Sequence, residues 1–144
     1  MKKLIYTLLA LVFATVLSAQ TGLFNLSYGM DADEASEILS ESGFELYIEN
    51  GNRLSFIDYD NYYVDEIVLN FSDYDGTLEN WVVYYLQQDD EDIEDLVLDA
   101  LIERHGDDFA VDFYNEVFIW ELDDIHTIVA GWDDYYLYVE YSTE

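Results

Sequence analysis

The chain has 144 residues, of which 33 are Asp or Glu and 4 are Lys or Arg, so its formal net charge is −29; Cys and Pro are absent. This length accommodates one ordinary domain, and a hydrophobic fraction of 51% separates the chain from charged disordered proteins, which lack material for a core. The charge argues against nucleic acids and anionic membrane surfaces as partners, because both are bound through Lys and Arg. The absence of Cys excludes disulfides, thiolate zinc sites and thiol catalysis.

The N-terminal segment has the pattern of a secretory signal peptide. Residues 1–3 form a basic start, residues 4–17 form an apolar run, and a small residue, Ala19, precedes the polar Gln20. The apolar run is shorter than the roughly 20 residues of a membrane-spanning helix. We expect cleavage between Ala19 and Gln20, or within a residue or two of that bond. The product would be a periplasmic or extracellular protein that is neither a lipoprotein nor a transmembrane protein.

Cleavage at this position makes the remaining chain almost purely anionic. Residues 20–144 contain two arginines, Arg53 and Arg104, no lysine and all 33 acidic residues, a formal net charge of −31. We expect residues 20–144 to form a single acidic domain, since no linker-like segment interrupts them.

Two segments carry helix signals. In the first, Asp31 is placed as an N-cap, Glu34 completes a capping box, and Gly43 ends the helix. Its predicted buried stripe consists of Ala35, Ile38, Leu39 and Ser42.

The second helix signal follows an acidic run, residues 89–92, and ends at Arg104, His105 and Gly106, which matches the helix dipole at both ends. Its predicted buried stripe consists of Ile93, Leu96, Val97, Ala100 and Leu101, widened by Leu98 and Ile102.

Strand signals fill most of the remaining chain. Short runs with alternating apolar residues are separated by polar turns, among them Asn50-Gly51-Asn52, which favours a tight hairpin. The predicted strands cover residues 44–49, 54–59, 65–71, 78–87, 116–122, 125–131 and 135–141. The sequence therefore predicts an α+β fold, an antiparallel meander of about seven strands with two helices packed on it. The order of elements also suggests two similar half-units.

One short segment carries a family resemblance. Residues 24–30, Phe-Asn-Leu-Ser-Tyr-Gly-Met, run into the acidic helix of residues 31–42. This opening resembles that of small exported bacterial domains in the broad group around β-lactamase inhibitory protein and the BamE-type envelope proteins. The resemblance implies a domain that binds other proteins through an exposed sheet face and is not an enzyme. The chain lacks the lipoprotein cysteine of the BamE type and the disulfides of the inhibitor.

The sequence offers no pattern typical of catalysis. It has no G-x-S-x-G motif and two histidines, of which His105 is predicted to cap a helix end and His126 to lie half-buried in a strand. A hydrolase using two carboxylates would leave no distinctive signal in so acidic a chain. We therefore expect no catalytic, cofactor-binding or metal-binding residues.

Calcium is the alternative cofactor, because it binds hard oxygen ligands. Candidate ligands cluster at residues 58–61, 73–76 and 123–124, but none of these segments has the spacing of an EF-hand loop. Asp and Gly also form turns, and every cluster lies where a turn is expected, so the turn-forming interpretation is preferred.

Tyrosines gather in or beside the predicted strands, at Tyr62-Tyr63, Tyr84-Tyr85 and Tyr135-Tyr136-Tyr138-Tyr141. Because neighbouring strand residues point to opposite faces, one face would bury its rings and the other would present them to solvent or a partner. Such a face inside an acidic surround suits a basic protein or a carbohydrate, and nothing in the sequence chooses between the two. We expect an exported, non-enzymatic binding domain of a bacterial envelope, with a basic protein as the first hypothesis for its partner. A Ca²⁺-stabilised surface or matrix component is the alternative function, and the acidity could also be an adaptation to a salty medium.

Overall fold

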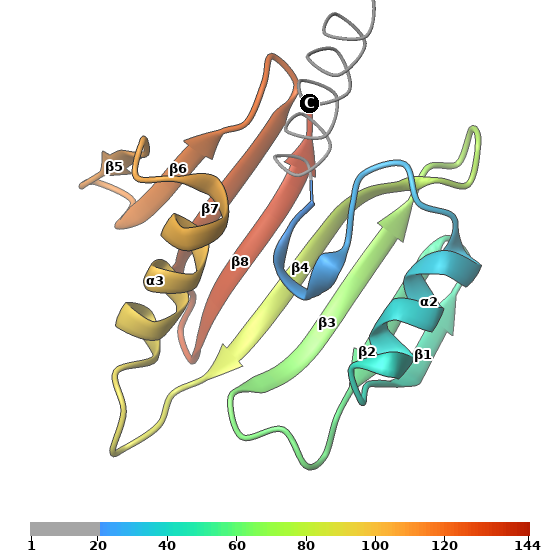
Figure 1. The fold of residues 1–144 in the computed structure, drawn as a ribbon, viewed down its shortest axis with the longest axis horizontal. Coiled ribbons are helices and arrows are strands. Elements are labelled where there is room, and N and C mark those ends of the chain that lie inside the picture. Colours follow the sequence, from blue (N-terminus) through green and yellow to red (C-terminus); the bar gives the residue numbers. More distant parts are fainter. Residues whose placement is uncertain (1–20) are drawn as a thin grey trace, which may run out of the picture.

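The computed structural model describes residues 21–144, which form an eight-stranded antiparallel sheet with two helices on one face (Figure 1). The predicted α+β class is confirmed. The predicted signal peptide and the cleavage point between Ala19 and Gln20 lie outside the described residues. No helix within residues 21–144 is long and apolar enough to span a membrane.

The sheet consists of two halves with the same order of elements. In chain order the elements are η1 (Leu23–Asn25), α2 (Ala32–Glu41), β1 (Glu45–Asn50), β2 (Arg53–Ile57), β3 (Val64–Phe71), β4 (Leu78–Leu86), α3 (Ile93–His105), β5 (Ala110–Asp112), β6 (Val117–Glu121), β7 (His126–Trp132) and β8 (Tyr136–Thr143). The strand order in the sheet is β1-β2-β3-β4-β8-β7-β6-β5. Each half is therefore a helix followed by four strands, and the last strands of the halves, β4 and β8, pair at the centre.

Helix α2 begins and ends where its caps predict. The Asp31 carboxylate accepts a hydrogen bond from the Glu34 N–H at 2.9 Å, and Glu34 Oε2 accepts one from the Asp31 N–H at 3.1 Å. Gly43 follows the helix with a φ of 94°. Ala35 and Leu39 are buried, whereas Ser42, predicted in the buried stripe, is exposed because it forms the C-cap.

Replacing Asp31 by alanine removes one half of the capping box and leaves the Glu34 N–H without its acceptor. We expect the free energy of unfolding to fall by about 1 kcal/mol, measured by urea denaturation. Asp33→Ala in the same helical turn is the matched control, because Asp33 is exposed and is not the capping residue. Equal effects of the two substitutions would contradict the capping role.

Helix α3 packs along a narrower stripe than the sequence predicts. Asp92 caps its first turn by accepting hydrogen bonds from the N–H groups of Glu94 and Asp95, at 3.1 and 3.3 Å. Ile93, Val97 and Leu101, spaced four residues apart, are buried against the sheet. The prediction that Leu96 is buried was wrong: its side chain is 47% exposed and borders an apolar hollow of about 340 Å³.

Most predicted strands are present within one or two residues of their expected bounds. Pairing of Asn50 with Arg53 leaves Gly51 and Asn52 as a two-residue turn, so the predicted hairpin is confirmed. The prediction of about seven strands missed β5, a strand of three residues that pairs with β6. Such a short strand has too few residues for alternation to be detectable.

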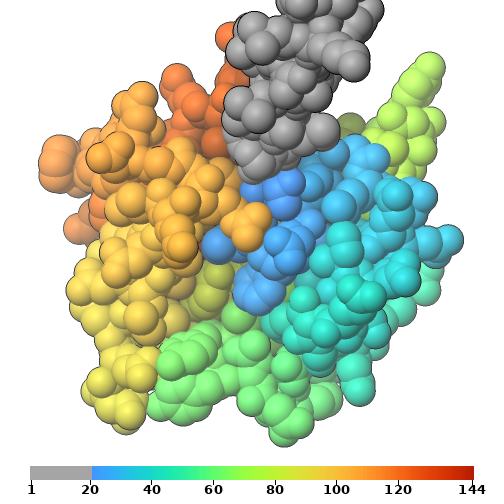
Figure 2. All heavy atoms as spheres, in the orientation of Figure 1, coloured from blue at the N-terminus to red at the C-terminus, as the bar shows by residue number. Residues whose placement is uncertain are grey.

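The N-terminal segment completes the core between the two helices. Residues 21–30 lie over the centre of the sheet, with α2 on one side and α3 on the other (Figure 2). Beneath them Trp81 and Tyr141 stack with ring centroids 4.4 Å apart, and both side chains are fully buried. The Leu23 N–H donates a hydrogen bond to the Tyr141 hydroxyl at 2.9 Å. Gly22 packs directly on the two rings.

Candidate functional site

The face of the sheet opposite the helices, called the open face here, carries a group of tyrosines. In the central strands the core side chains are buried, and they are Trp81, Val83 and Tyr85 of β4 and Leu137, Val139 and Tyr141 of β8. Because strand residues alternate between faces, Tyr84, Tyr136 and Tyr138 lie on the open face. The prediction that one face buries tyrosines and the other presents them is confirmed for β4 and β8.

These three side chains, the tyrosine cluster, lie next to one another on the paired strands β4 and β8. Tyr84 is directly opposite Tyr138 in the register, and it meets the Tyr136 ring edge-on with centroids 6.1 Å apart. Tyr138 extends over Gly131 of β7: a Cβ atom at Gly131 would lie 3.2 Å from the Tyr138 hydroxyl oxygen. The glycine therefore leaves room for the ring to lie along the sheet.

Carboxylates surround the tyrosine cluster. Glu66 is the cross-strand neighbour of Tyr84, and Glu140 lies two residues after Tyr138 on the same face. The pKa of Tyr84 is raised by burial and by the charges of Asp133 and Glu66, with Arg53 acting in the opposite direction. The pKa of Tyr138 is likewise raised by burial, Glu140 and Asp133. The rings therefore lie in a region of negative potential.

A hollow of about 360 Å³ adjoins the cluster at one end of the open face. Ile57 and Leu86 supply apolar wall, while Asp65 and Glu66 supply carboxylates. Glu66 accepts a hydrogen bond from the buried Ser55 hydroxyl, and burial raises the pKa of Asp65. Apolar walls with carboxylates suit a Lys or Arg side chain, whose aliphatic stem and charged end need different surroundings.

Tyr62 and Tyr63 do not belong to this surface. They lie in the loop between β2 and β3, between two of the predicted strands. Their hydroxyls donate hydrogen bonds to Asp90 at 2.9 Å and to Glu91 at 2.6 Å. The two side chains connect this loop to the segment before α3.

The predicted calcium ligands form turns. Asp58, Asp75 and Asp123 each accept a hydrogen bond from the N–H group two residues later, at 3.0, 3.1 and 2.9 Å. Within residues 21–144 no three His, Asp or Glu side chains converge as metal ligands. The turn-forming interpretation accounts for these residues.

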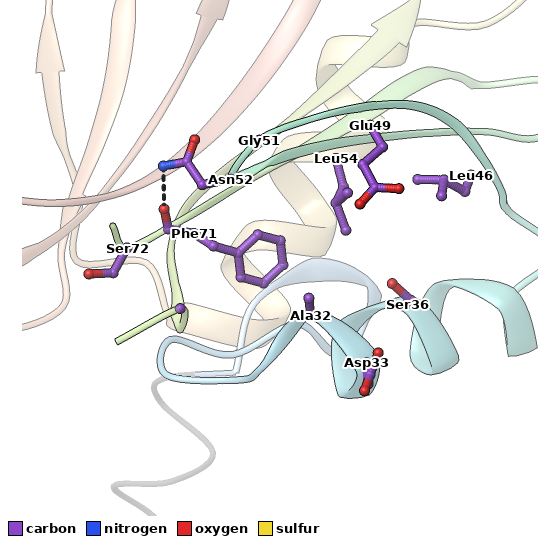
Figure 3. Close-up of a pocket in the computed structure, with 11 residues that line it drawn as sticks. Ala32, Asp33, Ser36, Leu46, Glu49, Gly51, Asn52, Leu54, Phe71 and Ser72 are labelled. Carbon is purple, nitrogen blue, oxygen red and sulfur yellow. Dashed lines mark hydrogen bonds between the residues drawn. The ribbon is translucent and has the colours of Figure 1, made fainter. Parts of the chain in front are cut away.

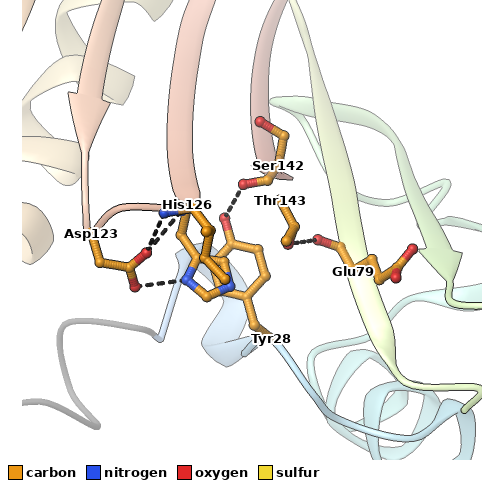
Figure 4. Close-up of polar contacts among 7 residues, drawn as sticks. Tyr28, Glu79, Asp123, His126, Ser142 and Thr143 are labelled. Carbon is orange, nitrogen blue, oxygen red and sulfur yellow. Dashed lines mark hydrogen bonds and ion pairs between the residues drawn. The ribbon is translucent and has the colours of Figure 1, made fainter.

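His126 lies among polar residues, with Asp123 and Tyr28 next to its ring (Figure 4). Its Nδ1 lies 2.7 Å from Asp123 Oδ2, and its ring packs on Tyr28 with centroids 4.0 Å apart and the two planes tilted by 32°. The Tyr28 hydroxyl donates to the carbonyl oxygen of Ser142 at 3.2 Å, and burial raises its pKa, which opposes activation. The arrangement joins the β6–β7 turn to the N-terminal segment, in line with the half-buried structural role predicted for His126.

His105 does not act as a charged partner of the α3 dipole. Its Nε2 lies 3.0 Å from the Tyr141 hydroxyl oxygen, and burial together with Arg104 lowers the pKa of His105 to about 4. The imidazole is therefore neutral at pH 7. The predicted dipole role was wrong, because this last residue of the helix turns toward the core.

No protein-family model, curated protein or solved structure matches the chain. The resemblance of residues 24–42 to the inhibitory-protein and BamE group stays a prediction. The open face is thus characterised by its own geometry. Sequence reasoning missed Gly131 and Glu66, because they become neighbours of Tyr138 and Tyr84 only through strand pairing.

Proposed function

We propose that this protein is an exported, non-enzymatic binding protein that holds a basic partner protein on its open face. The observation that carries the proposal is the tyrosine cluster flanked by Glu66 and Glu140 on a sheet face that neither described helix covers.

Two physical effects favour a cationic partner at this surface. Tyrosine rings attract Lys or Arg side chains through cation–π contacts of about 0.5–2 kcal/mol each, and Tyr is enriched at the centres of protein interfaces. The formal charge of −31 on residues 20–144 would steer a basic protein toward this chain and raise the association rate. The tyrosine rings would supply affinity at short range. The carboxylates would raise the association rate and select partners that carry positive charge.

The proposal predicts that Tyr84→Ser/Tyr138→Ser weakens partner binding by about 10- to 100-fold. The immobilised processed protein is used to capture proteins from the exported fraction, and the affinity of the captured partner is then measured. Binding is expected at low salt and to fall in about 1 M salt, where the Debye length is about 3 Å.

The matched control is Tyr74→Ser/Tyr114→Ser, which removes two highly exposed tyrosines from turns outside the open face. This control is expected to bind as the parent protein does. Absence of any salt-sensitive partner, or equal binding by the two double variants, would overturn the proposal.

A further inference from the structure

A second surface lies at the outer edge of the sheet, at β1. All six residues of β1 are exposed, and Leu46, Tyr47 and Ile48 are 51%, 59% and 49% exposed. The strand pairs with β2 on one side, and on its other side no strand within residues 21–144 pairs with its backbone N–H and C=O groups. The opposite edge strand, β5, has three residues and offers a much shorter ladder.

The edge of β1 is only partly protected against pairing. Natural edges are commonly blocked by Lys, Pro or a β-bulge. Residues 45–50 contain neither Lys nor Pro, but the register shifts between Leu46 and Ile48, which makes Tyr47 an extra residue. Because of this bulge, Leu46 and Glu49 both lie on the helix side of the strand, while Ile48 lies on the open face.

A groove of about 380 Å³ adjoins this edge, between α2 and the β1–β2 hairpin (Figure 3). Leu46, Leu54 and Phe71 form its apolar part, and Asp33 of α2 and Glu49 of β1 place carboxylates along it. A strand added to β1 would lie about 4.8 Å away and would send alternate side chains toward this groove.

We propose that β1 and the groove accept an extended segment of a partner protein, with alternating apolar and basic side chains, as a further strand of the sheet. Backbone hydrogen bonds to β1 supply affinity, and the groove selects side chains, as in other cases of strand addition. The basic side chains face the groove, where their aliphatic stems pack against Leu46 and their charged ends approach Asp33 and Glu49. The apolar side chains, which alternate with them, lie on the open-face side of the added strand beside Ile48. A second copy of this chain is disfavoured as occupant, because each copy carries a formal charge of −31 after the expected cleavage.

The test uses the isotopically labelled processed protein and an acetylated, amidated peptide of alternating lysine and valine. The backbone amide signals of β1 and of the first turn of α2 are expected to shift on titration, giving a dissociation constant. Leu46→Lys, which places a cation in the groove, is expected to weaken binding at least about tenfold. Val111→Lys is the matched control, since Val111 is an exposed residue of the opposite edge strand.

Two further peptides separate backbone pairing from charge attraction. The first is the lysine–valine peptide N-methylated at alternate residues, which removes the N–H donors from one edge of the peptide. The second alternates glutamate and valine. Both peptides are expected to bind at least about tenfold more weakly than the lysine–valine peptide. Thermal melting of each protein variant establishes that it is folded.

Three outcomes would overturn the inference: amide shifts confined to the open face, equal binding by Leu46→Lys and Val111→Lys, or no shift at all. The inference does not depend on the function proposed for the open face. Tyr84→Ser/Tyr138→Ser is expected to leave peptide binding at β1 unchanged, so each surface can fail without the other.

Discussion

Gly22→Val is expected to lower the free energy of unfolding by about 1–3 kcal/mol, through overpacking of a rigid site. A Cβ atom at this position would lie 2.6 Å from Tyr141 Cε1 and 2.7 Å from Trp81 Cζ2. The two rings are stacked and fully buried, so neither can move aside without opening the core.

Whether a substitution at Gly22 lowers or raises the free energy of unfolding distinguishes a packing effect from a backbone-conformation effect. The φ of Gly22 is −85°, a value that every residue adopts. In open space, replacing such a glycine by alanine stabilises a protein by about 0.4–1 kcal/mol, because the unfolded chain loses freedom. Here Gly22→Ala should instead destabilise, and Gly22→Val should destabilise more. Urea denaturation followed by tryptophan fluorescence measures both variants, and a gain in stability for either would contradict the packing.

This glycine shows that the segment just after the expected cleavage point belongs to the core. Leu26, four residues later, is completely buried, and the Gly22 N–H donates to the Leu26 carbonyl oxygen at 2.7 Å. Sequence reasoning did not predict this packing. Phe24 and Asn25 adopt left-handed φ values of 60°, and such values in non-glycine residues have no reliable sequence signal.

The elements that the sequence predicted correctly are those specified by local chemistry. The capping pair of Asp31 and Glu34, Asp92 before α3 and the turn at Gly51 each satisfy backbone groups within a few residues. The alternation of apolar residues located the longer strands. By contrast, Leu96 is exposed because α3 contacts the sheet along a narrow stripe of its surface. Nothing in the helix sequence specifies the width of that contact.

The candidate site likewise combines features that local sequence predicts with features that depend on strand pairing. Alternation is a local property, so it predicted that each of β4 and β8 carries tyrosines on both of its faces. The pairing of β4 with β8 joins the two halves of the chain, and this pairing brings Tyr84 opposite Tyr138. Strand pairing also places Gly131 beneath Tyr138, so these contacts could be found only with the strand order in hand.

His105 is expected to make the protein lose stability as the pH falls from about 6.5 to about 4. The pKa of His105 is lowered from 6.5 to about 4 in the folded protein, because the ring is half-buried and Arg104 is adjacent. Tyr141, whose hydroxyl lies 3.0 Å from Nε2, is the titratable side chain in contact with the ring, and burial raises its pKa. Neither Arg104 nor the neutral Tyr141 supplies a negative charge that would stabilise the imidazolium.

The number of protons bound by the folded and unfolded protein decides whether stability rises or falls with pH. Above pH 6.5 the imidazole is neutral whether the chain is folded or unfolded, so the stability is fully present. Between pH 6.5 and about 4 the unfolded chain binds a proton that the folded protein does not, so the free energy of unfolding falls as the pH falls. For a half-buried ring, screening by solvent reduces the expected loss to about 1–2 kcal/mol.

The comparison with His105→Gln isolates this contribution from that of the carboxylates. Glutamine retains a polar group near the Tyr141 hydroxyl but does not titrate. Asp75, Asp112 and Asp123, whose pKa values are lowered from 3.8 by hydrogen bonds, contribute stability that is also lost as the pH falls, mostly toward and below pH 3.8. These carboxylates are present in both proteins, so their contribution cancels in the comparison. Urea denaturation at several pH values should show that the parent protein loses more stability than the variant between pH 6.5 and 4. Parallel pH profiles would mean that the ring of His105 takes up its proton as readily in the folded protein as in the unfolded chain.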